Sequence, residues 1–174
     1  MLLAHTTTFI QTTSTMKRLY DRTKLSCLVV VFCFFFSCSK RVVYSEFQSV
    51  PDKMWDKQSE FLFHFDLKEA SVPYNISLQL RNNAFYPYEN IWIIIDTQNV
   101  DEIILQDTIE YSLADNTGKW KGNGIALFQN RFPLRTDCHF PDTGRYTLNI
   151  RHSMHDDRLR GIENIGLLIE KAEL

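Results

Sequence analysis

Apolar and polar residues alternate with a period of two along most of the chain after residue 60. In residues 60–67 and 74–82, every second side chain is apolar except Asn82, and the side chains between them are polar except Leu62. This period is typical of a β-strand with one buried face. The same reasoning predicts further strands at 91–97, 103–113, 125–132, 144–152 and 165–174.

Residues 91–97 are apolar on both faces, so we expect this strand to lie centrally in a sheet, with Trp92 in the core. Turn-forming residues separate the strands, for example at 115–118, 122–124 and 141–144. A convincing helical period is missing, apart from a short helical turn expected at 156–163.

Short strands joined by turns predict an all-β domain. Because most strands have one polar face, we expect two packed antiparallel sheets, and thus a single jelly-roll-like β-sandwich of about eight strands.

A basic segment, a short apolar run and a cysteine follow one another near the N-terminus. Lys17, Arg18, Arg22 and Lys24 precede the apolar run 25–37, and Cys38 follows a small residue. The run is shorter than the ~20 residues of a membrane-spanning helix. This layout favours a cleaved signal peptide over a retained anchor. Bacterial lipoproteins carry their lipid on a cysteine in this position, so we expect Cys38 to be lipidated.

These features divide the chain into four parts. We expect a start-site extension at 1–15, a lipoprotein signal peptide at 16–37, a lipidated cysteine and tether at 38–52, and the β-sandwich at 53–174. Alternatively, apolar residues within 42–47 pair at the edge of a sheet.

The net charge argues against nucleic-acid binding, and the cysteine content argues against a disulfide-stabilised fold. Without residues 1–38 the chain has 15 Lys and Arg against 20 Asp and Glu, a net charge of −5. This balance disfavours a nucleic-acid partner, which requires a basic face. Cys138 then has no disulfide partner besides the lipid-bearing cysteine, and we interpret it as a small buried hydrophobe.

Candidate chemical groups are few. His152, His155, Asp156 and Asp157 have the spacing of metal ligands, but no matching distant ligand is apparent, and a core histidine followed by a solvated turn is the better explanation. The carboxylate pairs 101–102 and 107–110 are expected on the surface. Familiar hydrolase, phosphate-binding and zinc-protease motifs are missing from the sequence. We therefore predict no catalytic residues, no metal, no cofactor and no small-molecule substrate.

Aromatic residues offer a different interpretation. Trp55, Tyr86, Tyr88, Trp92 and Trp120 could pack in the core or present rings to sugars or proteins. Trp120 lies between glycines in GKWKGNG, where packing and a contact surface are both reasonable.

Four stretches carry a family resemblance: FHFDL (63–67), YNISLQLRNNAFYPYENIWIII (74–95), DTIEYSLADNTGKWKGNG (107–124) and GRYTLNIRHSMHDDRLRGIENIGLLIE (144–170). Together with Cys38 they resemble the GldH gliding-motility lipoproteins of Bacteroidetes. The resemblance implies a lipid-anchored structural or assembly component of the gliding machinery, linked to adhesin secretion, with other machinery proteins as partners and no catalytic residues.

Ser39 and Lys40 follow the cysteine, whereas surface-exported lipoproteins of this phylum tend to have acidic residues there. We therefore expect the domain to face the periplasm from the inner or outer membrane.

Partner contacts are expected in loops 86–90, 120–124 and 155–160, because loops on a rigid sandwich commonly carry function. The candidate residues are Tyr86, Tyr88, Trp120, His155 and Arg158. One alternative is a glycan-binding lipoprotein of an outer-membrane uptake system. A second is a glycan-processing enzyme, which needs two carboxylates about 5–10 Å apart in a cleft.

Overall fold

The structure is a computed structural model that describes residues 41–98 and 103–172. The expected start-site extension, the signal peptide and Cys38 lie outside the described residues. Within the described residues, no helix is long and apolar enough to cross a membrane.

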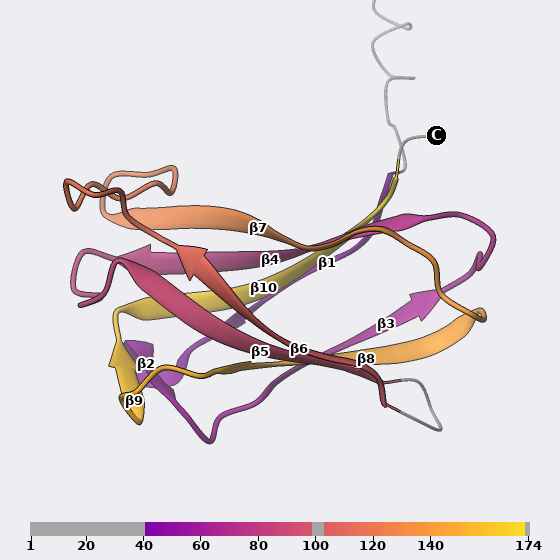
Figure 1. Ribbon diagram of the computed structural model, residues 1–174, viewed down its shortest axis with the longest axis horizontal. Helices are drawn as coiled ribbons and strands as arrows, with labels where there is room; N and C mark the ends of the chain where they lie inside the picture. Colours follow the sequence, from indigo (N-terminus) through magenta and orange to yellow (C-terminus); the bar gives the residue numbers. More distant parts are fainter. Residues whose placement is uncertain (1–40, 99–102, 173–174) are drawn as a thin grey trace, which may run out of the picture. The chain divides into compact units, whose positions relative to one another are not determined.

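Two four-stranded antiparallel sheets form the domain (Figure 1). One has the strand order β1-β10-β4-β7 and the other β3-β8-β5-β6, while β2 and β9 form a separate two-stranded ribbon. The strands are β1 (Val42–Ser49), β2 (Met54–Asp56), β3 (Phe61–Leu67), β4 (Tyr74–Asn83), β5 (Asn90–Gln98), β6 (Ile103–Ser112), β7 (Leu127–Cys138), β8 (Gly144–His152), β9 (Arg158–Arg160) and β10 (Ile162–Lys171). With the ribbon set aside, this order is that of a jelly roll, which confirms the expected fold class.

The structure corrects one predicted domain boundary and one predicted element. Residues 42–49 form the edge strand β1, paired antiparallel with β10, so the sandwich begins at Val42 and the expected tether through residue 52 is shorter. Residues 158–160 form the strand β9, where a helical turn was expected. Leu159 points inward between two outward arginines, so its pattern has the period of a strand.

Strand β7 runs six residues beyond the predicted end at 132. It contains Pro133, which sheets tolerate at an edge or near a bulge. Strand β7 is an edge strand, and its pairing with β4 shifts register between Ile76 and Ser77, opposite this proline.

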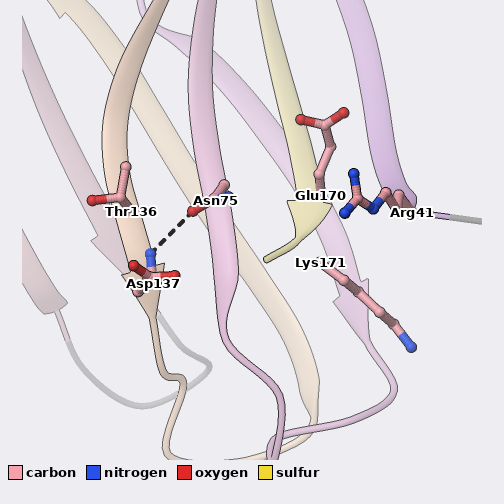
Figure 2. A pocket seen from close by; sticks show the side chains of 6 residues that line it. All are labelled: Arg41, Asn75, Thr136, Asp137, Glu170 and Lys171. Atoms are coloured by element: carbon pink, nitrogen blue, oxygen red, sulfur yellow. Dashed lines mark hydrogen bonds between the residues drawn. The ribbon is translucent and has the colours of Figure 1, made fainter. Parts of the chain in front are cut away.

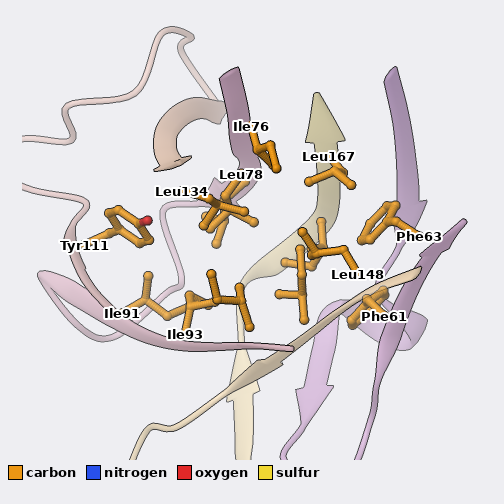
Figure 3. Close-up of a cluster of buried hydrophobic side chains, with 14 of the residues drawn as sticks. Phe61, Phe63, Ile76, Leu78, Ile91, Ile93, Tyr111, Leu134, Leu148 and Leu167 are labelled. Carbon is orange, nitrogen blue, oxygen red and sulfur yellow. The ribbon is translucent and has the colours of Figure 1, made fainter. Parts of the chain in front are cut away.

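The core lies between the two sheets (Figure 3). Phe63, Leu78, Ile93, Leu148 and Leu167 come from five strands and are almost completely buried. Each such side chain contributes about 1.5–3 kcal/mol through removal of its apolar surface from water. The alternation seen in the sequence therefore corresponds directly to the inner faces of the sheets.

Trp92 is not in the core, contrary to the sequence-based expectation. Its neighbours Ile91 and Ile93 are fully buried, and the period of two turns Trp92 to the outer face of the sheet. Its side chain is 39% exposed.

The jelly-roll connections gather at two ends of the sandwich (Figure 1). The connections 50–60, 84–89, 113–126 and 153–161 lie together, and we call this the loop end. Strand β1 begins at the opposite end, where Val42 pairs beside the last residues of β10 and the first of β4. We call this the tether end.

Candidate functional site

Three loops predicted from the sequence as contact regions meet at the loop end. The ring centroids of Tyr86 and Trp120 are 6.4 Å apart, which joins 84–89 to 113–126. The Tyr88 hydroxyl donates a hydrogen bond of 2.6 Å to Asp156 Oδ2, which joins 84–89 to 153–161. Residues distant in sequence therefore form one continuous surface.

Aromatic rings run through this surface in a chain. Tyr88 meets Tyr86 edge to face at 5.8 Å, and Trp120 stacks on Phe128 at 5.7 Å. Such pairs add about 0.5–1.5 kcal/mol each beyond simple burial. The chain therefore holds the loops in fixed positions relative to one another.

Tyr86 lies beneath the surface rather than on it. Its side chain is buried, and its hydroxyl donates to the Asn90 main-chain oxygen at 2.8 Å. Burial raises the pKa of Tyr86, so the phenol stays protonated and can keep donating. Tyr86 therefore supports Tyr88 and Trp120, which reach the surface.

Trp120 is positioned by a compact turn. One oxygen of the Asp115 side chain accepts hydrogen bonds from Thr117 and from the Lys119 main-chain nitrogen. These bonds, the Thr117 hydroxyl foremost, lower the pKa of Asp115. Ala114 and Trp120 then pair across the turn as an isolated bridge. Trp120 is half-buried in this arrangement, so it both packs and offers surface.

A hollow of about 430 Å³ lies beside Tyr88. Its walls come from the β2–β9 ribbon and from the 84–89 loop. The lining residues are Met54, Pro87, Tyr88, Asp156, Arg158 and Arg160. In the ribbon, Met54 pairs with Arg160 and Asp56 with Arg158, while Trp55 and Leu159 face the core. Strand alternation therefore turns both arginines to solvent.

His155 is exposed in the connection that precedes the ribbon and is not among the side chains lining this hollow. Of the five candidate contact residues, the structure thus brings Tyr88 and Arg158 together, places Trp120 nearby through Tyr86, and leaves His155 to the side.

Sequence reasoning did not single out Arg160, although it ends the expected contact loop 155–160, and it missed Met54 and the exposed side chains of Phe85 and Ile125 at the loop end. The signal for Arg160 was present. Arg158 and Arg160 flank an apolar residue with the period of a strand, but the segment was interpreted as a helical turn.

A second hollow, of about 360 Å³, lies at the tether end (Figure 2). Its lining residues are Arg41, Asn75, Thr136, Asp137, Glu170 and Lys171. Two of its charged side chains form ion pairs with residues outside the lining. Lys171 pairs with Glu69 at 2.7 Å, and Glu170 pairs with Arg131. The Asp137 main-chain nitrogen donates to Asn75 Oδ1 at 3.0 Å, drawn in Figure 2.

The histidine and the carboxylate considered as chemical groups from the sequence pack or pair with other residues of the domain. His152 is buried with its ring 5.2 Å from that of Trp55, as expected of a core histidine. Asp107 accepts a 2.9 Å bond from Arg135, which lowers the pKa of that carboxyl. Asp101 and Glu102 lie outside the described residues. Among the residues that the structure describes, no group of three or more His, Cys, Asp or Glu side chains could hold a metal.

The glycan-binding alternative depended on exposed rings. Trp55 and Tyr86 are buried, which removes two of the five aromatic residues considered for sugar stacking.

Comparisons with known proteins give a consistent result. The family model described as GldH lipoprotein matches residues 42–169, from β1 to β10. A gliding motility lipoprotein GldH homolog from Christiangramia forsetii is 27% identical over 87% of this chain and 99% of its own length. The gliding motility lipoprotein GldH of Flavobacterium johnsoniae is 27% identical over 84% of this chain and 95% of its own.

Among solved structures, a family GH115 4-O-methyl-α-glucuronidase aligns with 79% of this chain and 18% of its own, at 8% identity and a TM-score of 0.45. A likeness at this level carries no argument about function. The family match, by contrast, spans the whole sandwich, and the chain belongs to the GldH lipoprotein family.

Proposed function

We propose that this protein is a lipid-anchored structural or assembly component of the gliding-motility machinery. The observation that carries the proposal is the extent of the family match, which runs through the entire sandwich. Two relatives that bear the gliding-motility name align over nearly their full lengths. The proposal therefore concerns the whole domain and not one shared motif.

The anchor in this proposal is Cys38. It precedes Val42 by four residues, so extended chain can separate them by only about 14 Å. Acyl chains on Cys38 would hold the tether end close to the membrane, and two or more chains are needed for stable attachment. The ten-residue strands are about 33 Å long at ~3.3 Å per residue, so the loop end would point away from the lipid.

In this orientation the loop end is available to partners. Tyr88, Trp120, His155 and Arg158 are the proposed contact residues, and Tyr86 supports Tyr88 and Trp120 from below. Tyrosine, tryptophan and arginine are the side chains most enriched among energetically important interface residues. The sandwich acts as a rigid spacer that presents these loops at a fixed distance from the membrane.

The proposal also assigns a compartment and an association. Ser39 and Lys40 support a domain that faces the periplasm. A link to the secretion of surface adhesins follows from the family resemblance and belongs to the same proposal.

Gene deletion with complementation tests the proposal. We expect loss of single-cell gliding on deletion, recovery with the wild-type gene, and no recovery with Cys38→Ala despite stable protein. Cys138→Ala serves as the matched control, since it alters a cysteine within the sandwich and should restore gliding. Normal gliding of the deletion strain would contradict the proposal.

A further inference from the structure

Two arginines on β9 form the cationic wall of the hollow at the loop end. Arg158 and Arg160 flank the fully buried Leu159, and both are exposed. Residues two apart on a strand lie about 6.6 Å from each other and on the same face. The two guanidinium groups can therefore act on one ligand or on two adjacent groups of a ligand.

Neither arginine is neutralised at close range. Arg158 Nε lies 4.0 Å from Asp56 Oδ2, the outer limit of an ion pair. Within the described part of the chain, the Arg160 side chain has no ion pair or hydrogen bond, and the residue is held only through its main-chain pairing with Met54. Asp156, the acidic residue in the lining, already accepts the 2.6 Å hydrogen bond from Tyr88. The two guanidinium groups can therefore donate hydrogen bonds to a ligand, whereas the Asp156 carboxylate already accepts one from Tyr88.

The remaining lining is apolar or aromatic. Met54, Pro87 and the Tyr88 ring surround the two arginines. A ligand that is chemically complementary to the hollow therefore combines a negative charge with an aliphatic or aromatic portion. Glutamate and aspartate side chains, in an extended segment with apolar neighbours, have this combination.

The two walls of the hollow are fixed to each other by Gly161. Its nitrogen donates to the Lys53 oxygen at 2.9 Å, and its oxygen accepts from the Asn83 nitrogen at 2.8 Å. A Cβ at this position would lie 2.5 Å from the Tyr86 nitrogen, so the ribbon and the 84–89 loop approach as closely as glycine allows. A preorganised site loses less conformational entropy on binding.

We infer that this hollow binds the carboxylate side chains of an extended acidic segment of a partner protein. Arg160 supplies the principal contact and Arg158 the second, since guanidinium and carboxylate form paired, charge-assisted hydrogen bonds. Met54, Pro87 and Tyr88 pack against the apolar side chains of the same segment. The inference deepens the proposed function, on which it rests, by naming the chemistry of the partner contact.

Peptide binding to the full-length protein in detergent micelles tests the inference. The probe is a fluorescent peptide of alternating glutamate and leucine with both ends blocked, and the comparison peptide has glutamine in place of glutamate. We expect the glutamate peptide to bind with a Kd below about 1 mM by fluorescence anisotropy, and the glutamine peptide to bind at least about tenfold more weakly.

Arg160→Gln should weaken binding of the glutamate peptide at least about tenfold, and Arg158→Gln by a smaller factor. Arg145→Gln is the matched control, because Arg145 is 70% exposed at the tether end and pairs only with Asp66. Equal weakening by Arg160→Gln and Arg145→Gln would overturn the inference, as would equal binding of the two peptides or no binding. A phosphoserine peptide that binds more than about tenfold tighter would also overturn the carboxylate assignment.

Gliding assays separate this inference from the proposed function. We expect the Arg158→Gln/Arg160→Gln strain to glide poorly at wild-type protein levels. Normal gliding of that strain, where the deletion strain does not glide, would overturn the inference and leave the proposed function standing. Normal gliding of the deletion strain would overturn the proposed function and with it the partner.

Discussion

Phe47 on β1 lies directly over Gly166 on β10. The two residues pair in register, and a Cβ at position 166 would lie 2.7 Å from Phe47 Cδ1. The Arg81 guanidinium carbon lies over the same ring, 3.9 Å from its centroid. The ring thus contacts both a glycine of β10 and an arginine of β4, and it ties the edge strand to the sheet.

Gly166→Ala should therefore destabilise the domain, because the new methyl group needs space that Phe47 fills. We expect the free energy of unfolding to fall by about 1–3 kcal/mol in urea denaturation. Phe47→Ala in the same background should recover part of this loss, because it removes the clashing ring. Strict additivity of the two changes would contradict the close contact.

Gly161→Ala tests how the walls of the hollow are joined. The residue has φ +85°, and its Cβ would meet the main chain of Tyr86, which cannot rotate away. We expect a loss of about 2–4 kcal/mol in unfolding free energy.

Gly118→Ala is the matched control for this change. Gly118 has φ +80° with nothing within 4 Å of its Cβ position, so the substitution isolates the backbone strain and should cost about 1–2 kcal/mol. Equal losses at the two glycines would show that the ribbon and the 84–89 loop are not in contact.

His152 should make stability depend on pH. Burial lowers the pKa of this imidazole below its usual 6.5, and the charge of Lys57 acts in the same direction. The Trp55 main chain opposes this shift most, followed by the charges of Asp56 and Asp157. The unfolded chain then binds the proton more readily than the folded one. Stability is therefore full above pH 6.5 and falls as the pH drops towards the folded pKa, by up to about 1.4 kcal/mol per pH unit.

Urea midpoints between pH 5 and 8 check this prediction. His152→Leu should flatten the dependence near pH 6, and His155→Leu, which replaces an exposed histidine in the neighbouring connection, is the comparison variant. A slope that survives in His152→Leu would assign the dependence to other groups.

Trp120 and Trp92 offer a paired test of the proposed contact surface. Trp120 belongs to the loop end, and Trp92 is 39% exposed on the outer face of β5. We expect Trp120→Ala to slow single-cell gliding and Trp92→Ala to leave the speed unchanged, with protein levels and circular dichroism compared for both. The reverse order of effects would move the contact surface to the sheet face.

Much of the fold could be predicted from the sequence because a period of two is visible within each strand. Strand β8 matches its expected bounds, β3 differs from its own by one residue at one end, and β5 by one residue at each end. Trp92 was misplaced because both faces of its strand are apolar, so only the inward direction of Ile91 and Ile93 decides which face is buried.

The candidate site was harder to predict. The sequence indicated each loop separately, but it did not show that the loops lie together. Their proximity depends on the jelly-roll strand order, which brings 84–89 beside 153–161. The short ribbon was also missed, because the alternation of Arg158, Leu159 and Arg160 spans only three residues and was interpreted as part of a helical turn. The hollow lined by Arg160 was therefore visible only in three dimensions.

The pairing of the first strand with the last has a mechanical consequence. Strand β1 is hydrogen-bonded along its length to β10, from Val42 opposite Glu170 to Ser49 opposite Asn164. With the anchor proposed at Cys38 and a partner at the loop end, a pulling force would run parallel to β1. All of its hydrogen bonds would then resist shear together instead of opening one after another. This shear geometry of the β1–β10 pair suits a protein that transmits tension between a membrane and the gliding machinery.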